Sequence, residues 1–143
     1  MTMKIQIANT DSDLLACFPV MRELRPHVER GEFLSSIRNQ ERAGYRLAFA
    51  QAQDEPVTVA GFRISENLAW GRFLYVDDLV TCEHHRSKGY GTQMLAWLRV
   101  QAAQEGCNQL HLDSGSQRKD AHRFYLREGM QKFGFHFAER IMP

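Results

Sequence analysis

Residues 86–92, RSKGYGT, stand where a strand-like segment gives way to a helix-like one. The preceding residues 72–81 have the pattern of a strand, and residues 89–105 repeat apolar side chains at helical spacing. The first amides of a helix have no partners within the helix, and the helix dipole adds partial positive charge there. Glycines remove the side chains that would keep an anion away from those amides. The stretch therefore predicts a phosphate-binding turn between a strand and a long helix.

The spacing of the glycines excludes two common phosphate-binding motifs. The pattern RxxGxG matches neither GxxxxGK[ST] nor GxGxxG, which weakens the case for a nucleotide-binding domain of either class. An ordinary tight turn between a strand and a helix would also contain glycines at these positions. The residues alone therefore leave a phosphate-binding turn and a purely structural turn both open.

Length and composition place the chain among single-domain proteins. Its 143 residues suit one domain, residues 1–143, and a net charge of +1 argues against a broad nucleic-acid-binding face. No apolar run approaches the roughly 20 residues that cross a bilayer, so we expect a cytoplasmic protein. The three cysteines, Cys17, Cys82 and Cys107, lack zinc-ligand spacing and are expected to be reduced and mostly buried.

Apolar periodicity and turn residues predict an α/β fold. The expected order is β-α-α-β-β-β-α-β-α-β, with a mixed, mostly antiparallel sheet flanked by helices. Thr10 and Asp13 resemble a capping box at the start of the first helix. The expected strands are residues 4–8, 45–52, 57–64, 72–81, 109–113 and 131–140. The expected helices begin near Thr10 and cover residues 32–43, 89–105 and 118–127.

Two motifs in the correct order resemble the GNAT superfamily, the Gcn5-related N-acetyltransferases. Residues 80–95, VTCEHHRSKGYGTQML, resemble its Q/R-x-x-G-x-G/A motif, and residues 120–130, DAHRFYLREGM, resemble its later A-x-x-F-Y-x-x-x-G-F motif. The second segment, through HFAER, is especially similar to aminoalkylphosphonate N-acetyltransferases. The strand VDDLVT also resembles that of glucosamine-6-phosphate N-acetyltransferases. The resemblance covers nearly the whole chain and implies an acetyl-CoA-dependent enzyme.

The resemblance implies that the bound anion is the diphosphate of acetyl-CoA. Main-chain groups of the preceding strand would bind the pantetheine arm and the acetyl carbonyl, much as an added strand would. Many family members carry asparagine where this chain has Arg118, so that contact would fall to Ser114, Ser116 or Arg118 itself. The expected cofactor-binding residues are Leu79, Val80, Thr81, Arg86, Ser87, Lys88, Gly89, Tyr90, Gly91, Thr92 and Arg118.

Acetyl transfer to an amine needs a proton acceptor for the ammonium group and a proton donor for the leaving thiolate. Asp77 and Asp78 are neighbours on a strand, so they are expected to face opposite sides, with Asp78 in the cleft as the base. They could instead bind a substrate cation or satisfy backbone amides at a bulge. The resemblance places Tyr125 near the cofactor sulfur as the acid, and the main-chain amide of Val80 as the oxyanion donor. Without that resemblance, Tyr125 would be interpreted as a core residue.

The amine acceptor is expected between the first two helices, the strand 72–81 and the C-terminal tail. Arginines and histidines near this region would suit an amine that carries a phosphate or phosphonate. These are Arg22, Arg25, His27, His122, Arg123, His136 and Arg140. Peptide N-termini, lysines, polyamines and aminoglycosides stay open, as does a non-catalytic acyl-CoA-binding module. Family members often dimerise, and the apolar tail could contribute to a homodimer.

Overall fold

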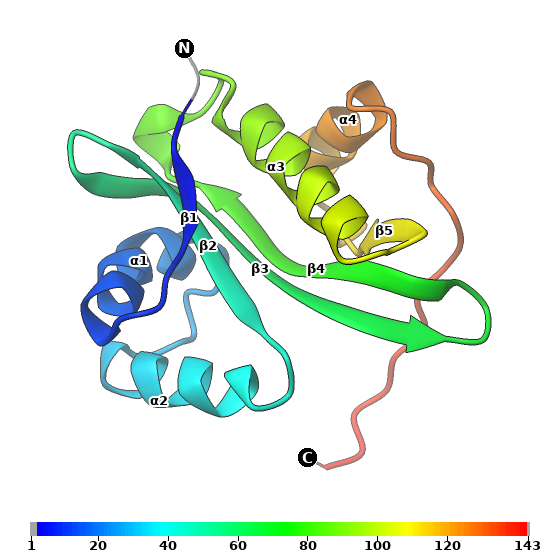
Figure 1. The fold of residues 1–143 in the computed structure, drawn as a ribbon, viewed down its shortest axis with the longest axis horizontal. Coiled ribbons are helices and arrows are strands. Elements are labelled where there is room, and N and C mark those ends of the chain that lie inside the picture. Colours follow the sequence, from blue (N-terminus) through cyan, green and yellow to red (C-terminus); the bar gives the residue numbers. More distant parts are fainter. Residues whose placement is uncertain (1–2, 143) are drawn as a thin grey trace. The chain divides into compact units, whose positions relative to one another are not determined.

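The computed structural model describes residues 3–142, which divide into two compact units at Leu112 (Figure 1). The elements of the first unit follow the expected order: β1 (Ile5–Ile7), α1 (Asp11–Leu24), α2 (Arg30–Glu41), β2 (Arg46–Ala52), β3 (Glu55–Asn67), β4 (Gly71–Thr81), η1 (Glu83–His85), α3 (Tyr90–Gln104) and β5 (Gln109–Leu112). The second unit begins at Asp113 and contains α4 (Lys119–Arg127). The predicted order is thus confirmed as far as α4.

The five strands form one mixed sheet in the order β1-β2-β3-β4-β5. The first four pair antiparallel, and β5 pairs parallel with β4 after the crossover through α3. Gln53 and Asp54 join β2 to β3 as a two-residue turn, and both have positive φ, which suits the twist of a tight hairpin. Strand β3 extends to Asn67, three residues beyond the predicted end at Ile64, because its exposed polar tip pairs with the start of β4.

Helices α1 and α2 cover one face of the sheet, and α3 covers the other (Figure 1). On the first face, Phe18 and Phe33 pack against each other within a cluster that also contains Leu47 and Phe49 of β2. Trp97 of α3 meets Phe62 edge to face on the opposite side. At the start of α1, Thr10 accepts a hydrogen bond from the Asp13 amide, as the predicted capping box requires. The sheet therefore lies between two helical layers.

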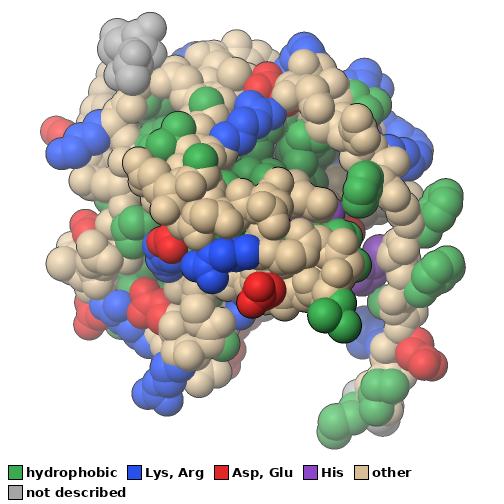
Figure 2. Space-filling model, turned by 45° about the vertical axis from the view of Figure 1, so that its right-hand side comes forward, with side chains coloured by type: hydrophobic (Ala, Val, Ile, Leu, Met, Phe, Trp, Pro, Cys, Tyr) green, Lys and Arg blue, Asp and Glu red, His purple; other side chains and the backbone are tan. Residues whose placement is uncertain are grey.

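The final strand predicted at residues 131–140 is not formed. These residues have no regular secondary structure, although their apolar side chains alternate. A strand needs a neighbour to bond its amides, and the described part of the second unit offers only α4. The side chains of Phe133, Phe135 and Phe137 are consequently exposed. Figure 2 shows hydrophobic side chains that stand out into solvent. No helix among the described residues is long and apolar enough to cross a membrane.

Candidate active site

The glycine loop after β4 forms an open turn at the start of α3. Gly89 is the N-cap of α3 and adopts a left-handed conformation with φ of 85°, which residues with a Cβ disfavour. A Cβ at Gly89 would meet no heavy atom of the described residues within 4 Å, so this side of the turn is open. The first turn of α3 lies wholly within the described residues and contains no acidic residue. No side-chain hydrogen bond caps the helix at Gly89. The turn thus has the geometry and electrostatics that favour an anion.

The two basic side chains of the loop have different surroundings. Lys88 is exposed beside Gly89. The guanidinium of Arg86 instead folds back toward β4, where Nε donates to the carbonyl of Thr81 at 3.1 Å and Nη2 lies 3.6 Å from Glu23 Oε1. The same Glu23 oxygen accepts a hydrogen bond from the Glu83 amide at 2.9 Å. Arg86 and Glu23 therefore tie the loop to the end of β4 and to α1.

The second half of β4 has an open main-chain edge. Strand β5 pairs only with residues 73–76 of β4, so among the described residues no strand lies beyond that point on this side. On its other side, β4 remains paired with β3 as far as Thr81. Along this edge, the main-chain groups of Leu79 and Thr81 point away from β3, whereas those of Val80 are paired with Val59. An extended ligand could bind along the edge, which then leads to the glycine loop.

A cavity of ≈ 480 Å³ lies within the first unit, between α1, α2 and β4. This is where the acceptor pocket was predicted, although all of its lining residues belong to the first unit and none to the tail. Apolar side chains of the two helices make one wall, and the two aspartates of β4 belong to the other. The lining consists of Met21, Arg25, His27, Val28, Phe33, Ser36, Ile37, Gln40, Tyr45, Tyr75, Asp77 and Asp78.

Asp77 and Asp78 both line this cavity, so the prediction that they face opposite sides is wrong. The register between β3 and β4 shifts here, because Gly61 lies opposite Asp78 and Phe62 lies opposite Val76. Asp77 therefore has no residue of β3 opposite it in the ladder. This extra residue is a β-bulge, and it interrupts the alternation of side chains along the strand. The bulge therefore brings two adjacent carboxylates to one wall of one cavity.

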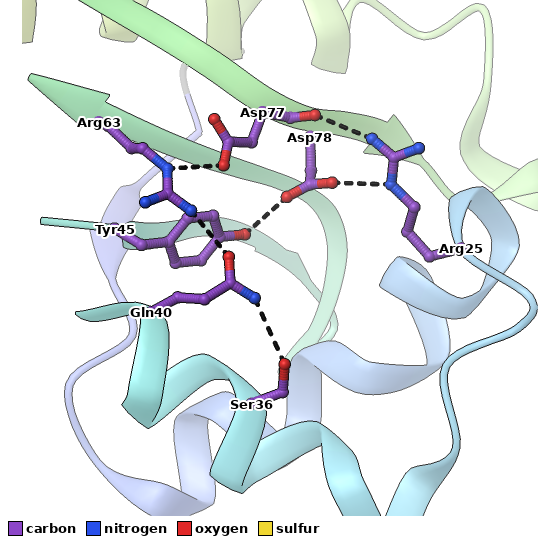
Figure 3. Close-up of polar contacts among 7 residues, drawn as sticks. All are labelled: Arg25, Ser36, Gln40, Tyr45, Arg63, Asp77 and Asp78. Carbon is purple, nitrogen blue, oxygen red and sulfur yellow. Dashed lines mark hydrogen bonds and ion pairs between the residues drawn. The ribbon is translucent and has the colours of Figure 1, made fainter. Parts of the chain in front are cut away.

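Asp78 is held by hydrogen bonds to both of its carboxylate oxygens (Figure 3). Arg25 Nε donates to Oδ1 at 2.9 Å, and the Tyr45 hydroxyl donates to Oδ2 at 2.8 Å. The side chain of Asp78 is 14% exposed. A carboxylate has further lone pairs, so Asp78 can still accept hydrogen bonds from the cavity.

Asp77 has an arginine of its own. Arg63 Nε donates to Asp77 Oδ2 at 2.8 Å, while Arg63 Nη2 donates to Gln40 Oε1 at 2.8 Å (Figure 3). The Asp77 carbonyl accepts a hydrogen bond from Arg25 Nη2 at 2.9 Å. The Arg63 guanidinium also lies over the Tyr45 ring, 5.3 Å from its centroid. Each carboxylate is thus paired with one arginine, so the wall carries little net charge.

Tyr125 and Arg118 belong to the second unit. Tyr125 lies on α4, where burial raises the pKa of its phenol and the positive charge of Arg118 partly opposes the rise. The phenol is therefore protonated at neutral pH, as a proton donor must be. Arg118 is the N-cap of α4 and makes no side-chain capping bond within the described structure.

Three residues of the aspartate network were not found from the sequence: Tyr45, Arg63 and Gln40. They lie on β2, β3 and α2 or next to them, far from the recognised motifs. One signal was present, because a glycine inside a strand, here Gly61, often marks a close approach by another group. The sequence cannot identify that group, since the approach depends on the sheet register.

Comparisons with known proteins agree with this geometry. The profile of the Acetyltransferase (GNAT) family matches residues 8–130. The uncharacterized N-acetyltransferase YhdJ of Bacillus subtilis is 33% identical over 119 residues, 82% of this chain and 81% of that protein. The aminoalkylphosphonate N-acetyltransferase of Salmonella typhimurium is 30% identical over 128 residues, 89% of this chain and 81% of that protein. The structure of AAC(6')-Iy with the bisubstrate analog CoA-S-monomethyl-acetylneamine has a TM-score of 0.87 over 100% of both chains, at 14% identity.

The chain belongs to the GNAT family of acetyltransferases. It is an acetyl-CoA-dependent N-acetyltransferase and acts on an amine acceptor. The residues present fit acetyl-CoA, because the open turn at Gly89 suits a diphosphate and the open edge of β4 suits an extended arm.

Proposed function

We propose that the enzyme acetylates the primary amine of a small molecule, bound in the cavity beside β4, by direct attack on the acetyl group. Bound acetyl-CoA supplies the activated acetyl group. The observation that carries the proposal is the bulge, which places Asp77 and Asp78 on the wall of a cavity next to the open edge of β4. An amine in this cavity would lie beside the carboxylates and within reach of that edge.

In this proposal, Asp78 accepts the proton of the incoming ammonium group, directly or through a water molecule. Asp77, whose charge is balanced by Arg63, offers further carboxylate lone pairs that can accept a hydrogen bond from the ammonium group. A main-chain amide of the open β4 edge, that of Leu79 or Thr81, would donate to the carbonyl oxygen as negative charge develops on it; the amide of Val80, which the sequence predicted for this role, faces β3 instead.

The amine nitrogen would attack the acetyl carbon, and the C–S bond would break as Tyr125 gives its proton to the departing sulfur. The second proton that the nitrogen loses would restore the phenol, while the first would pass from Asp78 to solvent. The Tyr125 phenol is protonated at neutral pH, because burial raises its pKa, so it has a proton to give.

In this proposal, the cofactor is held by the residues around the open turn and the β4 edge. The main-chain amides of residues 86–92 receive the diphosphate, and Lys88 adds charge from the surface. Arg118 remains a candidate ligand from the second unit. Arg86 acts mainly by bracing the loop, because Thr81 and Glu23 engage its side chain.

We further propose that the acceptor carries an anionic group. Arg25 lines the cavity with a side chain that is 40% exposed, and His27 lines it nearby. Arginine binds phosphonate and phosphate oxygens well because its donors form a planar fork. The similarity to an aminoalkylphosphonate N-acetyltransferase supports the same class of acceptor.

A substrate screen tests the proposal. The protein is incubated with acetyl-CoA and pairs of primary amines that differ only in a phosphonate, phosphate or carboxylate group, and thiol release is followed. We expect turnover of small amines, with higher kcat/KM for the anionic member of a pair. Mass spectrometry of the acetylated amine checks the product. Turnover of peptides but of no small amine would refute the proposal.

The exposed tail supports a proposal of homodimerisation. Five large apolar side chains of the second unit are between 67% and 91% exposed: Phe133, Phe135, Phe137, Ile141 and Met142. A second copy of the chain would bury this surface. Light scattering after size exclusion tests the proposal, and a monomer at micromolar concentration would contradict it.

A further inference from the structure

The Tyr45 side chain reaches the candidate base by passing over a neighbouring strand. Tyr45 lies directly before β2 and is 2% exposed. In the sheet, Leu47 of β2 lies opposite Gly61 of β3, and Gly61 lies opposite Asp78 of β4. The phenol must therefore extend across β3 before its hydroxyl can donate to Asp78 Oδ2, which it does at 2.8 Å.

Gly61 is the position that lets the phenol pass. A Cβ at Gly61 would stand 1.8 Å from the Tyr45 hydroxyl oxygen and 2.4 Å from the ring carbon that bears it. No side chain can occupy that space while the phenol is there, and Tyr45 is only 2% exposed. The absence of a side chain at Gly61 therefore leaves the space that the Tyr45 ring fills. This arrangement allows the Tyr45 hydroxyl to donate a hydrogen bond to the carboxylate of Asp78.

The chemistry of the phenol suits a fixed donor. Burial and then the negative charge of Asp78 raise the pKa of Tyr45 far above its usual value, so the hydroxyl keeps its proton. Arg25 bonds the other carboxylate oxygen, so the Asp78 side chain is held from two directions. The carboxylate thus has little freedom to rotate, and its remaining lone pairs have a defined direction in the cavity.

We propose that Tyr45 is a positioning residue for acetyl transfer, which acts by holding the Asp78 carboxylate toward the acceptor amine across Gly61. This inference rests on the proposed function, in which Asp78 accepts the amine proton. It differs from a packing role for the tyrosine, because packing requires only the ring. Phenylalanine would retain the ring and its contact with the Arg63 guanidinium, and would remove only the hydroxyl.

The first test is Tyr45→Phe, measured with the best amine from the substrate screen. We expect kcat to fall about 10-fold or more, since a misplacement of about 1 Å can cost about 10²-fold in rate. KM for the amine should change less than kcat, and the affinity for CoA, measured by calorimetry, should stay within about twofold, because the ring and the fold remain. An unchanged kcat would overturn the inference.

A double-mutant cycle separates positioning from general damage. If Tyr45 acts through Asp78, the double variant Tyr45→Phe with Asp78→Asn should be no slower than Asp78→Asn alone. Rate losses that multiply would overturn the inference and leave the base assignment standing. If Asp78→Asn itself retained full turnover, the assignment of Asp78 as base would fail and the inference with it.

Thr10→Ala is the control. The Thr10 hydroxyl accepts a hydrogen bond from the Asp13 amide at the start of α1, so the variant also removes one hydrogen bond, at a residue with no role in the proposed reaction. We expect kcat to change less than twofold. A loss equal to that of Tyr45→Phe would overturn the inference.

Gly61→Ala is a second way to break the hydrogen bond between Tyr45 and Asp78, because the added Cβ displaces the Tyr45 hydroxyl from Asp78. Wild-type kcat in a folded Gly61→Ala protein would also contradict the inference.

Discussion

Replacing Gly89 by valine should separate two costs, one in stability and one in cofactor binding. Gly89 has φ of 85°, and a residue with a Cβ in this left-handed region costs about 1–2 kcal/mol. No described atom within 4 Å would clash with the new Cβ, so the stability loss should not exceed that range by much. The added side chain would, however, project into the open turn that we assign to the diphosphate.

Gly106 at the other end of α3 provides the matched control. It has φ of 72°, and a Cβ there would also meet no described atom within 4 Å. Gly106→Val should therefore lose a similar 1–2 kcal/mol, roughly, with a fall of several °C in Tm. Because it lies away from the open turn, it should bind CoA as the wild type does.

Calorimetric titration with CoA, together with thermal unfolding, measures both quantities. Relative to Gly106→Val, we expect Gly89→Val to bind CoA at least about tenfold more weakly. This difference corresponds to about 1.4 kcal/mol of binding free energy. Equal stability losses with unchanged CoA affinity in both variants would refute the assignment of the turn.

Three further outcomes are expected. Tyr125→Phe should lower kcat roughly 10-fold or more with little change in CoA affinity, because general acid catalysis contributes about 10²–10⁴-fold where it operates; unchanged kcat would remove Tyr125 from the mechanism. Lys88→Gln should weaken CoA binding a few-fold at low salt and less at high salt, since Lys88 is exposed and its charge is screened; a loss that ignores salt would contradict this. Burial, with the nearby charge of Asp13, raises the pKa of Cys17 to about 12, so about one thiol in 10⁴ is ionised at pH 8 and native Cys17 should resist iodoacetamide. Mass spectrometry should find the partly exposed Cys82 or Cys107 modified first, and early alkylation of Cys17 would be inconsistent with its burial.

Local patterns were sufficient for most of the fold. Capping at Thr10, the turn after β2 and the glycine at the start of α3 each depend on a few neighbouring residues, and the structure contains all three. The tail was predicted wrongly because alternation in residues 131–140 was treated as sufficient for a strand. Strand formation also needs a partner, and a partner is a property of the tertiary fold.

The candidate active site could be predicted where its residues are neighbours in the chain, and could not be predicted where its contacts cross the sheet. The open turn and the edge of β4 are continuous in sequence, so motif and periodicity located them. The donors to Asp78 come from Arg25 and Tyr45, which lie 53 and 33 residues away in the chain. Only the register of β2, β3 and β4 brings Tyr45 to Asp78, and no local pattern encodes that register.

The error about Asp77 and Asp78 has a physical origin that bears on function. Strict alternation would put one carboxylate in the cavity and the other on the opposite face, against the layer formed by α3. One extra residue in β4 interrupts the alternation, because at the bulge two residues of β4 lie opposite one residue of β3. Both carboxylates can then face the cavity. Beyond the bulge, β4 also no longer pairs with β5, so no described strand occupies this edge. The same irregularity thus accompanies both features that the proposed reaction uses, a carboxylate wall for the amine and an open main-chain edge for the acetyl donor.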